Sequence, residues 1–225
     1  LNDNYAYHHV IQKIHNFCVH ELGGVYLDII KDRMYVTKSN SYARRSAQFA
    51  LFEVAEILIR LISPILVFTA EEIWQSHELF KKQSVSIFTA PQKILSEIES
   101  SISDEDWNKI FAVKDAVNQS IEKARADSVI KGSLDSKIII SCDKKTFKAL
   151  EKIEDELKFV FISSEVEIAE SSSSKLEIEV TNFDQKKCIR CWNKCSSVGL
   201  YAEDPEICSR CYTNVYGDGE IRKFV

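Results

Sequence analysis

The chain has 225 residues, which is room for about one and a half to two domains. Hydrophobic residues make up 45% and charged residues 28% of the chain, a balance that excludes global disorder. Only six glycines and three prolines occur, so helices should dominate over short strands and tight turns. The net charge of −5 argues against a wholly basic nucleic-acid-binding protein. The chain starts at Leu1 and its one methionine is Met34, so we expect a fragment of a longer protein.

The charge is unevenly distributed along the chain. Residues 1–91 are neutral, residues 92–181 carry −6 and residues 182–225 carry +1. The acidity therefore belongs to the middle of the chain, and basic clusters stand out in the two ends. We expect three domains with these boundaries.

Residues 1–91 are expected to form a helical bundle. Apolar residues recur at helical spacing, and the pair Gly23-Gly24 is expected to stop the first helix. A polar turn, Thr37–Ser41, is expected to separate the next two. The predicted helices are Tyr5–Leu22, Val25–Val36 and Ala43–Ser63.

A further helix is expected after Ser63-Pro64, which resembles an N-cap followed by a proline in the first turn. Thr69 and Glu72 resemble a capping box at the start of the same helix. Trp74 and, in the next block, Trp107 are predicted to be core residues. The histidines His15 and His20 have no acidic or cysteine partner at metal-ligand spacing, so they are interpreted as core or surface residues.

The middle block is predicted to be a small α+β module. Ser103 should cap a helix that runs to about Ala126, and a second helix should follow the period of Phe147, Leu150, Ile153 and Leu157. A serine-rich turn is expected at Ser171–Ser174. Strands are predicted at Ile138–Ile140, Phe159–Ile162 and Leu176–Val180.

The most specific pattern lies near the end of the chain. Cys188, Cys191, Cys208 and Cys211 have the spacing C-x2-C-x16-C-x2-C, which is typical of a structural zinc site in a reducing compartment. Four thiolates complete a tetrahedron and leave no position for a catalytic water. The alternatives are reduced surface thiols or two redox pairs. Cys195 is a fifth cysteine beyond the four expected ligands, and we interpret it as a free thiol near the site.

Bases surround these cysteines, and no acid occurs between Gln185 and Ala202. Trp192 directly follows the second cysteine, so a rigid knuckle would present a flat ring beside cationic side chains. Such a surface suits the stacking of an unpaired base and the binding of its phosphates. The alternative is that Trp192 covers the metal cluster as a hydrophobic lid. The bases are Lys186, Lys187, Arg190 and Lys194.

Taken together, these segments resemble the C-terminal region of the bacterial isoleucyl-tRNA synthetases. The resemblance rests on the two cysteine knuckles, on the closing segment Gly217–Phe224, and on segments of the first two blocks. Those segments are Tyr26–Arg33, Ala43–Gln48, Pro64–Trp74 and Ala124–Leu134. The Phe68–Trp74 segment is shared with the valyl, leucyl and methionyl relatives. The zinc knuckle also resembles that of the formamidopyrimidine DNA glycosylases, but their N-terminal proline nucleophile is missing here.

The resemblance implies a mainly α chain: a helical anticodon-binding bundle (1–91), an α+β junction (92–181) and a four-cysteine zinc module (182–225). It implies binding of the anticodon stem-loop of an isoleucine tRNA by a cytoplasmic, monomeric enzyme. That enzyme would attach isoleucine to its tRNA with ATP. No His-Ile-Gly-His or Lys-Met-Ser-Lys-Ser signature occurs here, so ATP use and editing are expected in other domains of the full-length chain. No segment is long and apolar enough to suggest a membrane span.

Carried onto this sequence, the resemblance places Arg190 and Trp192 near the anticodon. Lys186, Lys187 and Lys194 would contact phosphates. Arg33, Arg44 and Arg45 are further candidates, in a basic cluster with Lys31 and Lys38, although pairing with acids of the bundle is an equal alternative for Arg44 and Arg45. Two other functions stay open: a non-catalytic zinc-ribbon adaptor that binds partners through the acidic block, and a thiol switch that releases its metal on oxidation.

Overall fold

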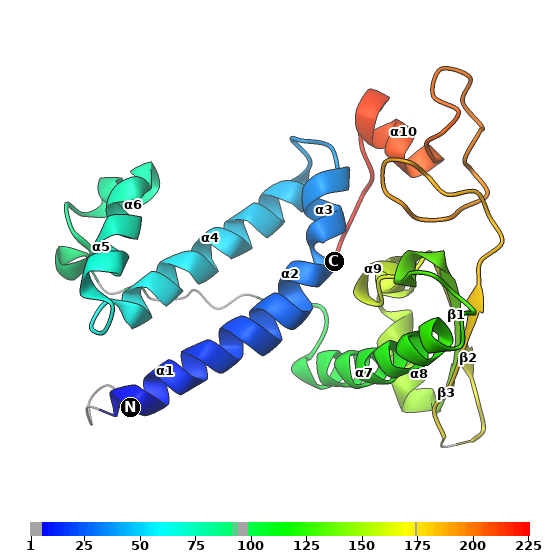
Figure 1. Cartoon of the computed structure of the whole chain (residues 1–225), viewed down its shortest axis with the longest axis horizontal. Coiled ribbons are helices and arrows are strands. Elements are labelled where there is room, and N and C mark those ends of the chain that lie inside the picture. The colour runs from blue at the N-terminus through cyan, green and yellow to red at the C-terminus, as the bar shows by residue number, and fades with distance from the viewer. Residues whose placement is uncertain (1–5, 92, 94–98, 174) are drawn as a thin grey trace. The chain divides into compact units, whose positions relative to one another are not determined.

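The computed structural model describes residues 6–91, 93, 99–173 and 175–225 (Figure 1). The described residues divide into two compact units. Unit 1 comprises the described parts of Leu1–Asp28 and Arg45–Ile98, and unit 2 those of Ile29–Arg44 and Glu99–Val225. Each unit is described by itself. The division into three consecutive functional domains stays a proposal.

The structure is mainly helical, with one small sheet. In chain order the helices and strands are α1 (Tyr7–Asn16), the π-helix η1 (Phe17–Tyr26), α2 (Leu27–Ile29), α3 (Lys31–Val36), α4 (Tyr42–Ile62), α5 (Val67–Ser76), α6 (Glu78–Gln83), η2 (Ile87–Thr89), α7 (Asp104–Ala126), η3 (Ser133–Asp135), β1 (Ser136–Cys142), α8 (Lys144–Glu151), η4 (Glu154–Glu156), α9 (Leu157–Val160), β2 (Glu165–Glu170), β3 (Glu177–Asn182) and α10 (Ser209–Tyr216).

The first helix does not stop at Gly23-Gly24, as its sequence predicted, but passes through the pair as a π-helix. The cause is the missing side chain. A Cβ at Gly23 would lie 2.9 Å from the carbonyl oxygen of Cys18, five residues earlier, and one at Gly24 would lie 3.2 Å from that of Val19. Glycine thus permits the close approach that the wider π turn requires. The predicted start at Tyr5 lies outside the described residues.

The core of unit 1 is built on Trp74, which is fully buried as predicted. Its ring stacks on that of Phe80, with centroids 5.1 Å apart, and its indole N–H donates to the carbonyl oxygen of Ser84 at 3.0 Å. The guanidinium of Arg60 lies 5.0 Å from the centroid of the same ring. One tryptophan therefore joins α4, α5, α6 and the segment that follows them.

Glu56 is the buried acid of this core, and it pairs with two cations. Its side chain is fully buried, yet it accepts hydrogen bonds from Arg60 at 2.7 Å and Lys93 at 3.1 Å. Burial opposes its ionisation, but the hydrogen bonds from Arg60, Lys93 and Gln83 hold the pKa of Glu56 below the ordinary value of 4.5. The carboxylate is thus ionised inside the unit and neutralised there.

Two predicted helix starts in unit 1 were wrong. Ser63 does not cap α5, because its hydroxyl donates to the carbonyl oxygen of Arg60 at the end of α4. Thr69 lies within α5, after the first helical residue Val67. The serine belongs to the preceding helix because a free carbonyl lies three residues before it, within reach of its side chain.

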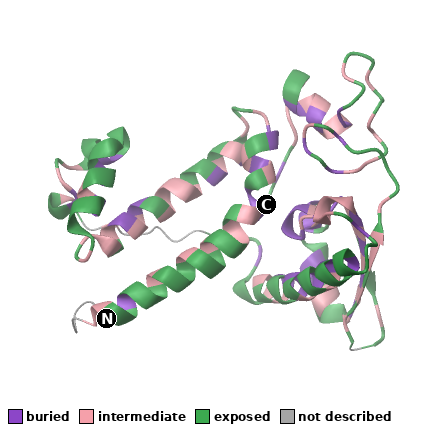
Figure 2. Cartoon of the chain, viewed as in Figure 1, coloured by how far each residue is buried: buried purple, intermediate pink, exposed green. Residues whose placement is uncertain are grey.

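The α+β module of unit 2 has a three-stranded sheet of order β2-β1-β3. β1 pairs in parallel with β2 and antiparallel with β3. Figure 2 shows the buried residues concentrated between this sheet and its helices, where α7 contacts β3 and α8 contacts β2. The fully buried side chains include Ile138 and Ile140 of β1, Val117 of α7 and Leu150 of α8.

Ser103 caps α7 as predicted, since its Oγ accepts the amide of Asp106 at 3.2 Å. The predicted strand at Phe159–Ile162 was wrong: this run lies at the end of α9, and the strand β2 begins only at Glu165. A short apolar run is compatible with either structure. Here Phe159 and Val160 are buried at the end of α9, and Phe161 is the buried C-cap residue that follows. Of the predicted serine turn, Ser174 lies outside the described residues.

Part of the acidity of the middle block lies on the exposed face of the sheet. Glu167 of β2 and Glu177 and Glu179 of β3 are all exposed. Further acids of the block lie in the first turn of α7 and in η4, so its negative charge is spread over strands and helices. No helix within 6–91, 99–173 or 175–225 combines the length and apolarity that crossing a membrane requires.

We expect Glu56→Gln to destabilise unit 1 by about 3–5 kcal/mol, because it removes the buried carboxylate that Arg60 and Lys93 share. Urea unfolding followed by hydrogen exchange in α4 and α5 measures the effect. Glu105→Gln is the matched control, since Glu105 pairs with Lys109 on an exposed surface of α7 and should contribute no more than about 1 kcal/mol. Equal effects of the two changes would contradict the structure.

The same carboxylate predicts a pH dependence. The pKa of Glu56 is lower in the folded chain than its ordinary value of 4.5, so its contribution is fully present above that value and is lost as the pH falls through the lowered pKa. Unit 1 should lose stability more steeply in this acidic range than the Glu56→Gln variant does. Parallel pH profiles for the two proteins would refute the assignment.

Candidate metal centre and RNA-binding surface

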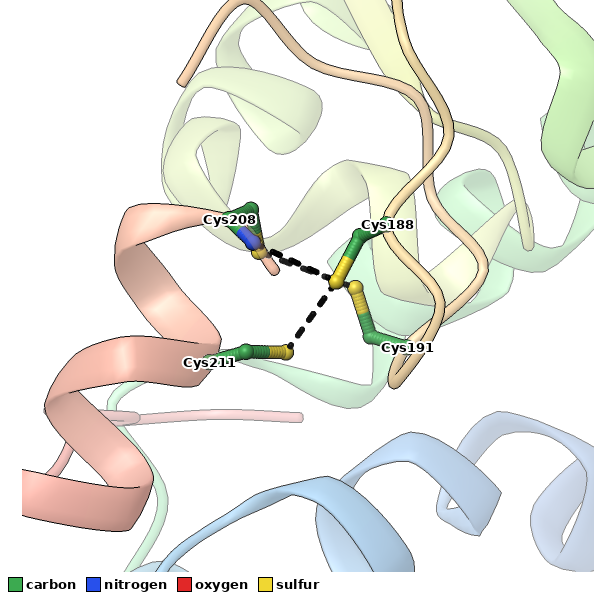
Figure 3. Close-up of side chains that lie close together, drawn as sticks. All are labelled: Cys188, Cys191, Cys208 and Cys211. Atoms are coloured by element: carbon green, nitrogen blue, oxygen red, sulfur yellow. Dashed lines mark hydrogen bonds between the residues drawn. The ribbon is translucent and has the colours of Figure 1, made fainter. Parts of the chain in front are cut away.

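The four predicted metal ligands converge in unit 2. The first knuckle is a hairpin in which the amide of Cys188 donates to the carbonyl oxygen of Asn193, and the amide of Trp192 to that of Cys188, each at 2.9 Å. Cys208 is the N-cap of α10, and Cys211 lies in its first turn. Figure 3 shows their sulfurs pointing toward the two sulfurs of the hairpin.

The spacing of the sulfurs fits one Zn²⁺. All four are buried and lie within 4.8 Å of one another; Cys188 and Cys211 are 3.7 Å apart, and Cys191 and Cys208 are 3.8 Å apart. A tetrahedron with Zn–S bonds of about 2.3 Å has edges of about 3.8 Å. The amide of Cys208 also donates to the sulfur of Cys188 at 3.3 Å, which supports a thiolate there. Four thiolates leave no open position, so the site is structural.

Charge gives a second reason for a cation. Hydrogen bonds from Cys208 and Cys211 hold the pKa of Cys191 well below its usual range. Hydrogen bonding to the same Cys191 raises the pKa of Cys208, and it raises that of Cys211 to about 12. Without a metal, the cluster therefore concentrates negative charge on one sulfur and keeps others protonated. A divalent cation lets all four ionise and displaces their protons.

Cys195 lies beside the cluster without belonging to it. It packs against the buried cysteines, and its sulfur is 3.4 Å from the hydroxyl of Ser197. Hydrogen bonding to Cys208 lowers the pKa of Cys195 to about 6. Among the described residues, only the two C-x2-C pairs form the four-sulfur group.

The zinc module is fixed to the end of α3. Val36 belongs to the same buried cluster as the four cysteines and Ile207. Arg190 Nη1 donates to the carbonyl oxygen of Val36 at 2.7 Å and lies 3.7 Å from the sulfur of Cys211. We call these contacts, with those of Lys38 below, the α3 joint.

Lys38 forms the other half of the α3 joint. Its Nζ donates to the carbonyl oxygen of Gly217 at 2.7 Å, and its amide donates to Asn214 at 3.2 Å. A Cβ at Gly219, where φ is +90°, would lie 3.1 Å from the Cβ of Lys38. The glycine therefore meets two needs at once: a left-handed backbone and a close approach.

An ionic cluster holds α3, α10 and the last residues together. Arg210 grips Asp32 with two parallel hydrogen bonds of 2.6 and 2.8 Å. Arg222 also binds Asp32 and reaches Glu220 at 3.2 Å. The guanidinium of Arg222 lies 3.2 Å from the ring centroid of Phe159. Bidentate hydrogen bonds and stacking by arginine fix the orientation of the joined segments and also stabilise them.

The final segment is tied to the α+β module by Glu156. This buried carboxylate accepts the amides of Lys223 at 2.6 Å, Phe224 at 3.0 Å and Val225 at 2.6 Å. A single side chain thereby satisfies three consecutive main-chain donors. The zinc module, α3 and the α+β module are thus linked within unit 2.

Two basic residues of the α3 joint, and Arg44 of α4 beside it, bind main-chain carbonyls instead of acids. These are Arg190 on Val36, Lys38 on Gly217, and Arg44, whose Nη2 donates to the carbonyl oxygen of Thr37 at 2.7 Å. Within the described part of the chain, no carboxylate pairs with any of them. A carbonyl fixes a cation without cancelling its charge, so Lys38 and Arg44 keep their positive charge, whereas Arg190 also faces the sulfur of Cys211. The predicted pairing of Arg44 with acids of the bundle is not seen.

The other candidate RNA-binding residues lie in different surroundings. Lys186 and Lys187 are exposed. Lys194 donates to Asn182 at 2.9 Å and lies 3.9 Å from Asp135, so part of its charge is balanced. Arg33 is buried, with 7% exposure. Arg45 belongs to unit 1, where it is exposed and donates to Gln48 at 2.9 Å.

The indole ring of Trp192 faces solvent and does not cover the metal site. Its side chain is 62% exposed, and its φ of +66° places a bulky residue in the left-handed region. Such conformations cost about 1–3 kcal/mol and cluster at functional sites. The exposed ring leaves the covering of the metal to Val36 and Ile207.

Sequence reasoning missed the ionic cluster of Asp32, Arg210, Glu220 and Arg222, and also Glu156. The sequence pattern around these residues does not predict their contacts, because each is an ordinary charged residue and the partners are up to 190 positions apart. The one indication in the sequence is the alternation of glycine and acid at Gly217–Glu220, which is compatible with a fixed turn.

Comparison with known proteins identifies this arrangement. A family model described as "Anticodon-binding domain of tRNA ligase" matches residues 2–140, and one described as "Zinc finger found in FPG and IleRS" matches residues 185–214. The chain belongs to the anticodon-binding domain family of tRNA ligases.

Curated relatives similar to this chain are isoleucine–tRNA ligases. The chain is 41% identical to an isoleucine–tRNA ligase of Alcanivorax borkumensis and 40% identical to one of Saccharophagus degradans, over 100% and 99% of its length. A third, from Shewanella pealeana, is 41% identical over 99% of the chain. The chain spans 25% of the length of each of these relatives.

Removal of zinc by a chelator should unfold residues 186–216 and leave α4 and α5 of unit 1 intact. This segment buries few apolar side chains apart from its cysteines, so metal binding, of order 10 kcal/mol, supplies most of its folding free energy. Hydrogen exchange before and after chelation measures it. Amides of the knuckles that remain protected after complete zinc removal would contradict the proposal.

Two cysteine variants are matched controls for that experiment. Cys208→Ser should lose zinc, whereas Cys195→Ser should keep one zinc per chain. Metal analysis of the purified variants distinguishes a four-sulfur site from one that recruits the fifth thiol.

Proposed function

We propose that this chain reads the anticodon stem and loop of an isoleucine tRNA for a ligase that attaches isoleucine with ATP. The α3 joint carries the proposal. Lys38 and Arg44 have no acidic partner among the described residues, Arg190 lies between them and the cysteine cluster, and the knuckle of this cluster exposes Trp192.

These side chains suit a single-stranded loop of RNA. Unpaired bases can stack on an exposed ring, while cations at fixed positions bind the phosphates between them. Zinc fixes the knuckle in advance, so little conformational entropy is lost on binding. Lys186 and Lys187 extend the positive surface on the same hairpin. Arg33 and Lys194 act through the scaffold in this proposal, because one is buried and the other is engaged within unit 2.

The chemical step belongs to other parts of the enzyme. The nucleotide-binding signatures His-Ile-Gly-His and Lys-Met-Ser-Lys-Ser do not occur in the 225 residues. We therefore assign ATP use, isoleucine activation and editing to domains outside this chain. We further propose that the full-length enzyme is a cytoplasmic monomer whose other partners are its own domains.

Trp192→Ala should weaken binding of an isoleucine anticodon stem-loop by about 1–3 kcal/mol, the usual contribution of one stacked base. Zinc content should stay unchanged, because the ring is exposed and does not cover the metal. Fluorescence anisotropy with a labelled hairpin measures binding, and metal analysis checks the site. Loss of zinc in this variant would instead support the lid interpretation.

The lysines should respond differently. Lys186→Ala and Lys187→Ala should each reduce the slope of log affinity against log salt by roughly 0.7, the value for one phosphate contact on a single strand. Lys144→Ala, at an exposed lysine of α8, is the control and should change nothing. A zinc-ribbon adaptor would show no RNA affinity in any of these measurements.

A further inference from the structure

We propose that Tyr35 and Tyr42, which flank the α3–α4 turn, are two further base-stacking residues and form one RNA-binding surface with Trp192. This inference rests on the proposed function and adds to it the residues that receive the bases. It starts from an imbalance in how the chain uses its tyrosines.

Both rings are largely exposed. Tyr35 is 78% and Tyr42 is 85% exposed. Neither ring nor hydroxyl has a partner among the residues that the structure describes.

The tyrosines of the zinc module show the contrast. Tyr201 and Tyr212 stack with centroids 3.7 Å apart and planes 3° from parallel, and the hydroxyl of Tyr216 donates to Asp204. Those rings are used within the module. Tyr35 and Tyr42 therefore differ from them in having no such internal role.

The turn that carries the two rings is rigid. Thr37 Oγ1 donates to the carbonyl oxygen of Arg33 at 2.6 Å, and Ser41 Oγ donates to Thr37 Oγ1 at 3.2 Å. The amide of Ser41 donates to the carbonyl oxygen of Lys38 at 3.0 Å. A ring held on such a turn loses little backbone freedom when a ligand binds.

The turn is also fastened to the knuckle that bears Trp192. Arg190, two residues before Trp192, binds the carbonyl oxygen of Val36, the residue after Tyr35. Lys38, in the same turn, binds the carbonyl oxygen of Gly217. The three exposed rings are thus carried by elements that the α3 joint holds together, all within unit 2.

The charge around the rings favours RNA over a protein partner. Arg190, Lys38 and Arg44 supply positive charge to the turn, and the nearby acid Asp32 is already neutralised by two arginines. Exposed aromatic rings beside fixed cations are the usual composition of a surface for single-stranded nucleic acid. In this proposal the rings receive successive splayed bases of a loop, whereas a duplex would offer them none.

The test uses the zinc-loaded protein and a hairpin with the isoleucine anticodon in its loop. Tyr35→Ala and Tyr42→Ala should each weaken binding by roughly 5- to 150-fold, the equivalent of one lost stacking contact. Tyr35→Phe and Tyr42→Phe should retain wild-type affinity, because the phenyl ring still stacks. Phe68→Ala, which removes an 89% exposed ring of α5 in unit 1, is the matched control and should have no effect.

A fluorescent base placed at each loop position reports on stacking directly. Its emission should be quenched by the wild-type protein and recover at one position in Tyr35→Ala and at another in Tyr42→Ala. Zinc content and the circular dichroism spectrum should be unchanged in both variants.

The outcomes separate the two proposals. If Trp192→Ala weakens binding but both tyrosine variants bind like wild type, this inference is wrong and the proposed function stands. If the wild-type protein binds a duplex of equal length as tightly as the hairpin, the rings do not receive bases and the inference is overturned. If it binds no RNA, the proposed function fails and this inference with it.

Discussion

The packing of four sulfurs against the end of one short helix organises unit 2. Val36 shares its buried cluster with the cysteines, and Arg190 bridges the sulfur of Cys211 and the carbonyl oxygen of Val36. Metal, knuckle and helix end therefore form one rigid body. Because α3 has only six residues, it cannot be stable by itself. The zinc module, which has no large core, and α3, which has too few residues, stabilise each other.

This mutual support explains why the basic residues of the joint bind carbonyls. A salt bridge would have fixed the same geometry and cancelled the charge. Asp32, Arg210, Glu220 and Arg222 show that the chain uses paired charges where orientation alone is needed. The two arrangements lie in the same unit. In the ionic cluster the charges neutralise one another and hold the parts together. The basic residues that bind carbonyls keep positive charge that, under the proposed function, binds the RNA phosphates.

The zinc site could be predicted from the sequence because its chemistry is local: two C-x2-C hairpins need only a loop long enough to bring them together. The main helices and the strands β1 and β3 followed from hydrophobic period. What could not be predicted depends on distant contacts or on ambiguous local preference. Gly23-Gly24 permits a π turn as well as a helix end, and Phe159–Ile162 fits a strand or a buried helix. The hydrogen bond between Arg190 and Val36 joins residues 154 positions apart, and no local sequence pattern predicts it.

The backbone at Trp192 sets stability and binding against each other. Its left-handed φ of +66° is a conformation that glycine or asparagine adopts with far less strain. A chain selected only for a well-folded zinc knuckle would therefore hold a small residue there. Under the proposed function, the demands of the surface, and not those of the fold, account for the large aromatic side chain at this position. Loss of selection for binding should allow this site to drift toward glycine while the four cysteines persist.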